Sequence, residues 1–219
     1  MITRVKNAGF SNNRLAGKYV EVSFTTLLQN KEGRQHQTRI KAKVHYFEAG
    51  PSQGKAILLL HGAMQSSYSF RHNLTALSQT HRVIVPDLLG HGYSDCPDMD
   101  YTVEDYALFI EAFANAVGLE KFSVIAVGQS AAYALDFCYY NNRRIEKIVL
   151  LSPGAFENTR GAGAASIGGF FGPLVMRRYA NKAYVRKYLS RSFFDKTRLK
   201  EKDIAERHDY RRIHFVFLW

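Results

Sequence analysis

The stretch Phe122-Ser123-Val124-Ile125-Ala126-Val127-Gly128-Gln129-Ser130-Ala131-Ala132 decides the fold, because it predicts a buried strand that turns sharply into a helix. The strand is expected over Phe122–Val127, and the helix over Tyr133–Tyr140. A serine at such a turn sits on a strained corner with its hydroxyl exposed, and the residues two places before and after it must be small. Gly128 and Ala132 meet that condition. We therefore predict that Ser130 is a nucleophile, although a serine in a tight turn can also be purely structural.

Strands and helices alternate on both sides of this stretch. Further apolar strands are predicted at Ala56–Leu60, Arg82–Val85 and Lys147–Leu151, with helices between them at Ser67–Leu77 and Thr102–Val117. Alternation of this kind implies crossover connections and a parallel sheet. The short, fully apolar strands are typical of a sheet that is buried on both faces. The fold class expected is therefore α/β, with a mostly parallel, doubly wound sheet.

Two elements outside the alternating region are also predicted. Tyr19–Leu28 and Ile40–Glu48 are expected to form strands joined by a hairpin-type turn at Lys31–Arg34. The helix Thr102–Val117 has a capping box of Thr102 and Asp105, and Gly118 is expected to end it.

Composition limits the classes of protein to consider. The chain has 219 residues, of which 46% are hydrophobic and 22% charged, as in a globular protein with one domain or one domain plus a small insertion. No stretch is long and apolar enough to cross a membrane, and no secretory signal is recognised at the N-terminus. Two cysteines, Cys96 and Cys138, do not make a disulfide framework, so a cytoplasmic location is the default expectation.

The net charge of +11 is concentrated in part at the C-terminus, where residues 177–219 carry 13 Lys/Arg and 5 Asp/Glu. A basic segment can bind nucleic acid or an anionic membrane surface. Acidic residues are interleaved with the basic ones and no nucleic-acid motif is present, so we expect a solvated helical face and no nucleic-acid partner. Weak binding to an anionic surface stays open.

Acyl transfer by a serine also needs amide N–H groups that bind the oxyanion. The N–H of Ala131, at the start of the helix, is one candidate. The second is expected from the loop His61-Gly62-Ala63-Met64 that follows an earlier strand, with Ala63 as the donor and Met64 as the alternative. Gly62 allows the backbone of this loop to turn close to a ligand.

Three segments together resemble the α/β-hydrolase fold family. The strand followed by His61-Gly62 resembles its oxyanion loop, and Gly128–Ala132 resembles its nucleophile elbow. The segment from Asp87 to Asp95 resembles its D-x-x-G-x-G-x-S motif. The match covers roughly Lys41 to Pro153. It resembles the compact branch of esterases, C–C bond hydrolases, cofactor-free haloperoxidases and proline iminopeptidases; the serine at position 130 disfavours relatives with an aspartate nucleophile.

The polar residues of these segments also have structural interpretations. His61 is expected to hydrogen-bond beneath the oxyanion loop rather than to act as a base, and His91 to fix its own loop. Asp87 and Asp95 are expected to brace that loop by hydrogen bonds. Cys138 is expected to be a buried helix residue.

The resemblance implies an acid and then a histidine after the serine, each following a late strand. No such strand is predicted after Pro153, and the downstream histidines, His208 and His214, lack the expected surroundings. The triad acid and base are therefore not identified, and the chain is expected to be truncated at its C-terminus. The domains expected are an extension over residues 1–18, a hydrolase core over 19–154, a helical lid over 155–208 and a tail over 209–219.

The function implied is that of a serine hydrolase that acts on a small ester, amide or activated C–C bond, with no metal or organic cofactor. Aromatic residues of the lid, Phe156, Phe170 and Phe171, suggest an apolar acyl group in the substrate. The alternative is a non-catalytic, hydrolase-like protein that binds a ligand or a partner, because without a base Ser130 would be a weak nucleophile.

Overall fold

In a computed structural model of the chain, the structure describes residues 16–30, 32–63, 65–154 and 195–205, together with residues 183, 186, 187, 189 and 190. Most of the predicted extension and lid, and the whole predicted tail, lie outside the described residues. The domain boundaries expected from the sequence therefore stay predictions.

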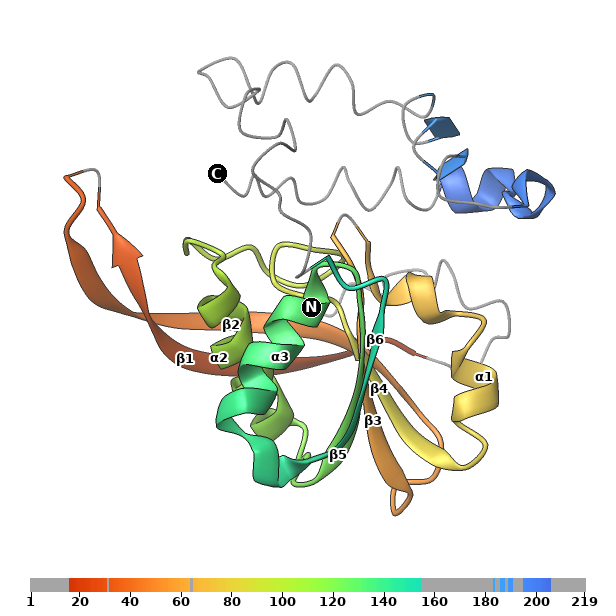
Figure 1. Cartoon of the computed structure of the whole chain (residues 1–219), viewed down its shortest axis with the longest axis horizontal. Helices are drawn as coiled ribbons and strands as arrows, with labels where there is room; N and C mark the ends of the chain where they lie inside the picture. The colour runs from red at the N-terminus through yellow and green to blue at the C-terminus, as the bar shows by residue number, and fades with distance from the viewer. Residues whose placement is uncertain are drawn as a thin grey trace, which may run out of the picture.

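A six-stranded sheet forms the centre of the molecule, with the strand order β1-β2-β4-β3-β5-β6 (Figure 1). The strands are β1 (Lys18–Gln29), β2 (Gln35–Ala49), β3 (Lys55–Leu60), β4 (His81–Pro86), β5 (Phe122–Val127) and β6 (Ile145–Leu151). Strands β4, β3, β5 and β6 are parallel, whereas β1 and β2 pair antiparallel with each other and β2 pairs antiparallel with β4. The predicted, mostly parallel sheet is confirmed.

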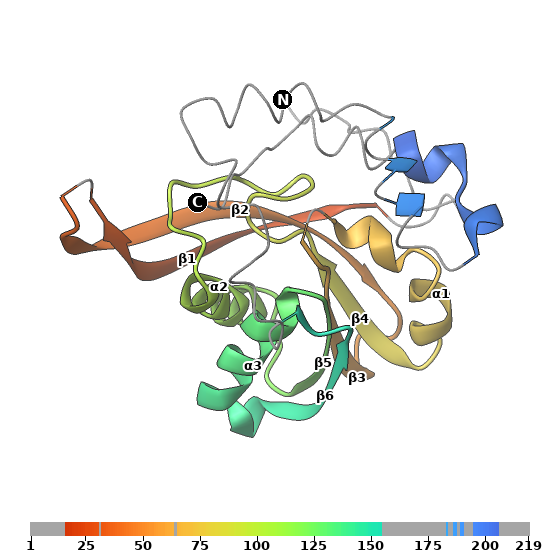
Figure 2. The same cartoon turned by 45° about the horizontal axis from the view of Figure 1, so that its top comes forward.

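Helices cover both faces of this sheet. Helices α2 (Val103–Ala116) and α3 (Ser130–Tyr140) lie side by side on one face, and the short α1 (Leu74–Leu77) lies on the other (Figures 1 and 2). Strand β3 shows why both faces are closed. Leu58 and Leu60 point into the cluster beneath α2 and α3, and Leu59 points into the cluster on the α1 side. All three side chains have no exposed surface, as the uninterrupted apolar run predicts.

The helix predicted over Ser67–Leu77 is wrong as a single element. The segment forms a 3₁₀ turn, η1 (Ser67–Phe70), and then the four-residue α1. The break falls at Asn73, whose amide donates to the Phe70 carbonyl at 2.9 Å. Asn, Ser and Thr are weak helix formers because their side chains compete with the backbone for hydrogen bonds, and this segment is rich in them.

Helix α2 agrees with its sequence signals. The Thr102 side chain accepts from the Asp105 amide at 3.1 Å, and the Asp105 carboxylate accepts from the Thr102 amide at 2.9 Å. Gly118 ends the helix with a φ of 67°, in the left-handed region that favours glycine. This helix is therefore fixed at both ends, and its buried face packs against α3 and β1.

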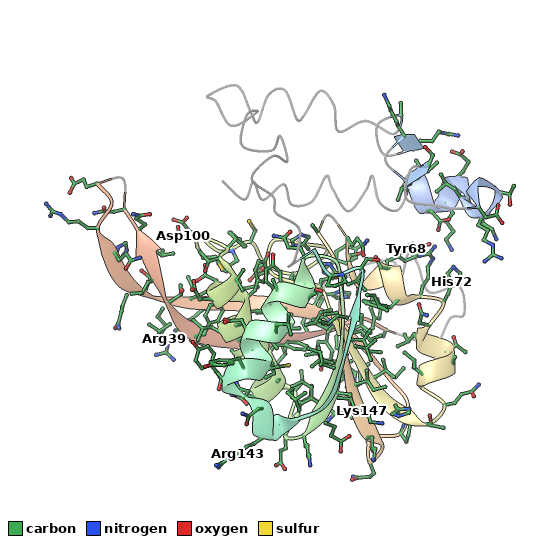
Figure 3. The ribbon with its side chains drawn as sticks, viewed as in Figure 1. Arg39, Tyr68, His72, Asp100, Arg143 and Lys147 are labelled. Carbon is green, nitrogen blue, oxygen red and sulfur yellow. The ribbon has the colours of Figure 1, made fainter. Side chains whose placement is uncertain are left out.

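Strands β1 and β2 extend as a two-stranded arm well beyond the part of β2 that pairs with β4 (Figure 1). The arm carries polar side chains; Arg39, labelled in Figure 3, donates to the Ser23 hydroxyl across the pair at 2.9 Å. Strand β6 forms the opposite edge of the sheet, and several of its apolar side chains are unusually exposed. Its residues Ile148, Val149 and Leu151 are 37%, 45% and 46% exposed.

The described residues near the C-terminus contact the α1 side of the core. The Arg71 guanidinium lies over the Tyr68 ring at 4.2 Å and also pairs with the Asp203 carboxylate at 2.5 Å. Residues 201–205 are helical and lie within the span expected for the helical lid, and Leu189 and Ile204 form a small apolar cluster. Figures 1 and 2 both place this segment above α1.

Candidate active site

The corner after β5 lies at Gly128. This glycine has a φ of 61°, the left-handed conformation that a strand-to-helix turn requires. Its amide donates to the Leu151 carbonyl at 2.9 Å, and its carbonyl accepts from the Gly154 amide at 3.0 Å. The next residue, Gln129, already has helical dihedral angles, φ −64° and ψ −31°. The whole change of direction therefore takes place at Gly128.

Ser130 is the first residue of α3 and does not stand at the corner. Its side chain has no exposed surface. The hydroxyl oxygen accepts from the Val127 amide at 3.0 Å, and the hydroxyl hydrogen can be donated to the Leu60 carbonyl at 2.9 Å or to the Val127 carbonyl at 3.0 Å. The prediction that this hydroxyl is exposed at the corner is wrong; Ser130 ties the end of β5 to the end of β3.

The loop after β3 brings its backbone against the same corner. A β-carbon on Gly62 would lie 3.0 Å from the Val127 carbonyl oxygen, so any larger residue would crowd the close approach of the two strand ends. His61 is fully buried; its Nε2 accepts from the Leu88 amide at 3.0 Å, and its Nδ1 donates to the Gly62 carbonyl at 2.9 Å. These two hydrogen bonds are of the kind expected of a residue that supports this loop.

The two predicted oxyanion donors differ in their surroundings. Ala63 is exposed at the tip of the loop, and the alternative donor, Met64, lies outside the described residues. The Ala131 amide instead donates to the Gly128 carbonyl at 3.2 Å, inside the first turn of α3. The Ala131 amide is thus already engaged in this arrangement.

A buried carboxylate holds the loop between β4 and α2. Asp87 has no exposed surface and accepts from the Ser67 amide at 2.7 Å, the Tyr93 amide at 3.0 Å and the His45 Nδ1 at 2.8 Å. Asp95 accepts from the Lys43 amide at 2.7 Å. The bracing roles predicted for both aspartates are confirmed.

Several effects act on the pKa of Asp87, and their sum lowers it below its usual value. Burial raises it, and the hydrogen bond to His45, the charge of that imidazole and the Ser67 amide lower it by more. The carboxylate therefore stays ionised in the core, as its three donors require.

His45 is the partner that the sequence did not single out. It lies on β2, 5% exposed, on the face opposite the alternating residues Val44 and Tyr46. The aromatic ring of Phe47 packs edge-on against it at 4.9 Å. The available signal was the pair of alternate residues His45 and Phe47, which lie on the same face of the strand.

His91 fixes its own loop, as predicted: its Nδ1 donates to the Leu89 carbonyl at 3.0 Å, and its ring lies 5.2 Å from that of His61. Near the corner, burial raises the pKa of the Tyr133 hydroxyl. Cys138 is half-buried on α3, and burial raises its pKa to about 11, so its thiol is a poor nucleophile.

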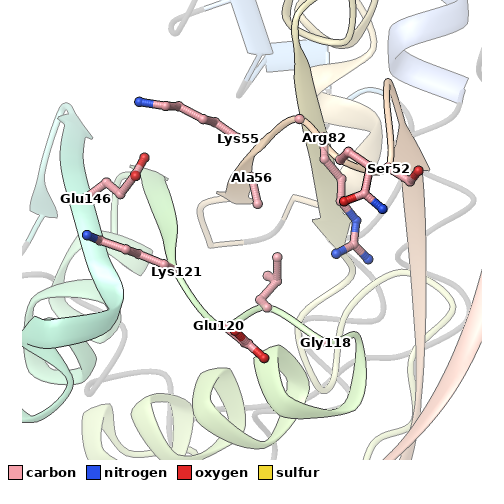
Figure 4. Close-up of a pocket in the computed structure, with 11 residues that line it drawn as sticks. Ser52, Lys55, Ala56, Arg82, Gly118, Glu120, Lys121 and Glu146 are labelled. Atoms are coloured by element: carbon pink, nitrogen blue, oxygen red, sulfur yellow. The ribbon is translucent and has the colours of Figure 1, made fainter.

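A separate cavity of about 350 Å³ lies at the opposite, amino-terminal end of the parallel strands (Figure 4). Lys55, Arg82, Lys121 and Glu146 line it. Arg82 is already engaged with the Glu48 carboxylate at 2.7 Å and the Val117 carbonyl at 2.9 Å. This cavity does not include Gly128 or Ser130 and is not part of the corner site.

Among the described residues, no group of three or more His, Cys, Asp or Glu side chains is arranged to hold a metal ion. A search of the same part of the chain finds no helix with the length and apolar character needed to span a membrane.

Comparison with known proteins identifies the class to which this fold and corner belong. The family model described as the α/β hydrolase fold matches residues 55–187. The chain belongs to the α/β-hydrolase fold family.

Two relatives show the range of activities in the sequence neighbourhood. A haloalkane dehalogenase of Agrobacterium fabrum is 31% identical over 111 residues, which cover 51% of this chain and 36% of that protein. A cis-3-alkyl-4-alkyloxetan-2-one decarboxylase of Shewanella oneidensis is 32% identical over 136 residues, 60% of this chain and 42% of that protein. The chain therefore spans well under half the length of these relatives. Similarity to a dehalogenase also means that the resemblance does not favour the esterase branch alone.

Solved structures confirm the fold. The naproxen esterase of Bacillus subtilis superposes with a TM-score of 0.63 at 19% identity, covering 86% of this chain and 61% of that one. The meta-cleavage product hydrolase of Pseudomonas fluorescens superposes with a TM-score of 0.64 at 22% identity, covering 77% of this chain and 60% of that one. At these identities the likeness establishes architecture and not substrate.

Proposed function

We propose that this protein is a hydrolase that acts on a small ester, amide or activated carbon–carbon bond. The substrate would bind at the carboxyl ends of β3 and β5. One observation carries the proposal: the Gly62 and Gly128 backbones meet at this edge of the sheet, a β-carbon on Gly128 having the Gly62 Cα at 3.9 Å. Ligands of open α/β sheets bind at the carboxyl ends of the strands, and the relatives named above are enzymes.

The finer hypothesis assigns nucleophilic attack to Ser130 and oxyanion binding to the N–H groups of Ala63 and Ala131. In the described conformation, this route requires the Ser130 hydroxyl to leave the Leu60 and Val127 carbonyls and the Ala131 amide to leave Gly128. An apolar acyl group in the substrate stays a prediction, because the lid aromatics on which it rests lie outside the described residues.

A second candidate function is non-covalent binding of a ligand or partner. The burial of Ser130 favours it, since a hydroxyl with no exposed surface cannot reach a substrate carbonyl without rearrangement. The two functions share the same edge of the sheet and differ in whether a bond is broken there.

Turnover of a short-chain aryl ester tests the hydrolase proposal, with an anilide and a vinylogous diketone as amide and C–C substrates. We expect hydrolysis above the buffer rate, and its loss in Ala63→Trp, which fills the exposed side of the loop. Ala76→Trp, at an exposed position of α1, is the matched control and should keep the activity. Folded protein that hydrolyses none of the three substrates would overturn the proposal and favour the binding function.

A fluorophosphonate probe separates the chemical routes. Labelling of Ser130, lost in Ser130→Ala, supports the serine nucleophile. Turnover without labelling keeps the hydrolase and rejects that nucleophile. Absence of both, in protein shown to be folded by circular dichroism, supports the binder.

A further inference from the structure

We propose that Gly128, and not Ser130, occupies the position from which a nucleophile would project in this fold, so that the corner carries no reactive side chain. Ser130 is then a positioning residue that holds the corner together. The inference concerns the site used in the proposed function but does not depend on turnover.

Backbone geometry locates the position. A nucleophile elbow places its reactive residue at the strained turn between strand and helix, where its side chain is exposed. The residue that follows β5 and has left-handed dihedral angles is Gly128, with a φ of 61°. Ser130 lies two residues further on, within α3. A shift of two residues along the turn separates the hydroxyl from the corner.

The space around a side chain at position 128 also differs from that at position 130. A β-carbon built on Gly128 has its nearest neighbour, the Gly62 Cα, at 3.9 Å, an ordinary van der Waals contact. Gly128 is half-buried and Gln129 is exposed, whereas Ser130 has no exposed surface. A side chain at position 128 would have room to project towards the loop of Gly62; the side chain at 130 has none.

The hydrogen bonds of Ser130 explain why a serine is present without a reactive role. Its oxygen satisfies the Val127 amide at the end of β5, and its hydrogen can satisfy the Leu60 carbonyl at the end of β3. Both backbone groups belong to the last residues of buried strands, where an unpaired polar group costs about 1–3 kcal/mol. A small hydrogen-bonding residue at this position thus stabilises the approach of the two strands.

Backbone surrounds the corner on its other sides. A β-carbon on Gly62 would lie 3.0 Å from the Val127 oxygen, and one on Gly154 would lie 3.6 Å from the Gln129 nitrogen. Of these glycines, Gly62 is the one at which a β-carbon would be tightly crowded, whereas Gly128 and Gly154 would each place it at an ordinary van der Waals distance. The described residues at this corner supply peptide groups and open space, and they supply no side-chain nucleophile.

The reactivity of a cysteine thiol introduced at position 128 or 130 measures directly how accessible each position is. The variants Gly128→Cys and Ser130→Cys are made in a background in which Cys96→Ser and Cys138→Ala remove the only two native thiols. Each is treated with iodoacetamide, folded and in denaturant, and the native rate is divided by the denatured rate. We expect the Gly128→Cys thiol to react within about 10-fold of its denatured rate. The Ser130→Cys thiol should be slowed at least about 100-fold, because it reacts only when the corner opens.

A β-carbon at a left-handed position is strained, so folding of Gly128→Cys is checked by circular dichroism and thermal melting. Gln129→Cys, exposed and with ordinary dihedral angles, is the positive control for reagent access to the turn. If Gly128→Cys does not fold, Ser130→Cys alone decides the matter. A folded Ser130→Cys protein whose thiol reacts as fast as that of Gln129→Cys overturns the proposal, and so does a folded Gly128→Cys protein protected as strongly as Ser130→Cys. Neither readout depends on hydrolysis, so this proposal can fail while the proposed function stands, and the reverse.

Discussion

The imidazole Nδ1 of His45 donates a hydrogen bond of 2.8 Å to the carboxylate of Asp87, and both side chains are buried. The pair joins β2 to the loop after β4, two segments 42 residues apart in the sequence. Removing one partner of such a buried contact leaves the other group buried without compensation, which costs more than the contact contributes on its own. Two predictions follow from this contact.

Asp87→Asn should lower the free energy of unfolding by about 3–5 kcal/mol, because an amide cannot accept from the His45 imidazole and the Ser67 and Tyr93 amides together. Urea unfolding followed by circular dichroism measures the loss. Asp98→Asn, at an exposed aspartate nearby in sequence, should change the free energy by less than about 0.5 kcal/mol. Equal effects of the two substitutions would mean that the buried network contributes little.

The free energy of unfolding should decrease as the pH is lowered into the acid range. The pKa of Asp87 is lower in the folded than in the unfolded state, so its contribution is complete above the unfolded value, about 3.9. It is then lost as the pH falls below that value towards the folded pKa. Burial raises the pKa of Glu48, but Lys18 and Arg82 lower it by more, so Glu48 adds a decline of the same sign. Urea unfolding should be measured between pH 7 and pH 3. The free energy of unfolding should decrease less at acid pH in Asp87→Asn than in the unsubstituted chain. Equal decreases in the two proteins would contradict this.

Ser130→Ala should destabilise the fold by about 1–3 kcal/mol, because the Val127 amide and the Leu60 carbonyl lose a partner in a buried place. Ser123→Ala, on the same strand–helix unit but half-buried, should cost under about 1 kcal/mol. A nucleophile that serves catalysis alone would give the opposite pattern, with stability unchanged or improved by the substitution to alanine.

Two glycines with left-handed backbone, Gly118 and Gly92, allow the cost of backbone strain to be measured separately from the cost of a steric clash. A β-carbon on Gly118 (φ 67°) meets no atom within 4 Å, so Gly118→Ala should cost only the conformational strain, about 1–2 kcal/mol. A β-carbon on Gly92 (φ 56°) would lie 2.2 Å from the Asp87 carboxylate, so Gly92→Ala should cost clearly more. Thermal melts of both variants should show the larger decrease for Gly92→Ala. Similar decreases would mean that the Asp87 loop gives way easily.

Sequence patterns predicted the sheet well because its strands obey simple periodicity. The uninterrupted run at Ala56–Leu60 indicated burial on both faces, and the capping box at Thr102 located the start of α2. Asp87 and Asp95 were correctly expected to brace their loop, since an aspartate carboxylate accepts the hydrogen bonds that a turn leaves open.

The position of the corner could not be predicted in the same way, because two windows of small residues overlap. Gly128-Gln129-Ser130-Ala131-Ala132 and Ala126-Val127-Gly128-Gln129-Ser130 both have small residues at their ends. The first window places the nucleophilic hydroxyl of Ser130 at the corner, whereas the second places Gly128 there. Backbone energy favours the second, since glycine adopts a positive φ at far lower cost than serine. The structure follows the backbone. The helix over Ser67–Leu77 failed for a related reason, because periodicity does not show where weak helix formers interrupt a helix.

The exposed outer strand has a practical consequence for handling this protein. Ile148, Val149 and Leu151 present apolar side chains beside the free peptide groups of β6, which among the described strands pairs only with β5. Such a strand templates the addition of another chain, so purified material should form higher-order species as its concentration is raised. A lysine at Val149 would repel a second copy and give a more soluble sample for crystallisation or NMR.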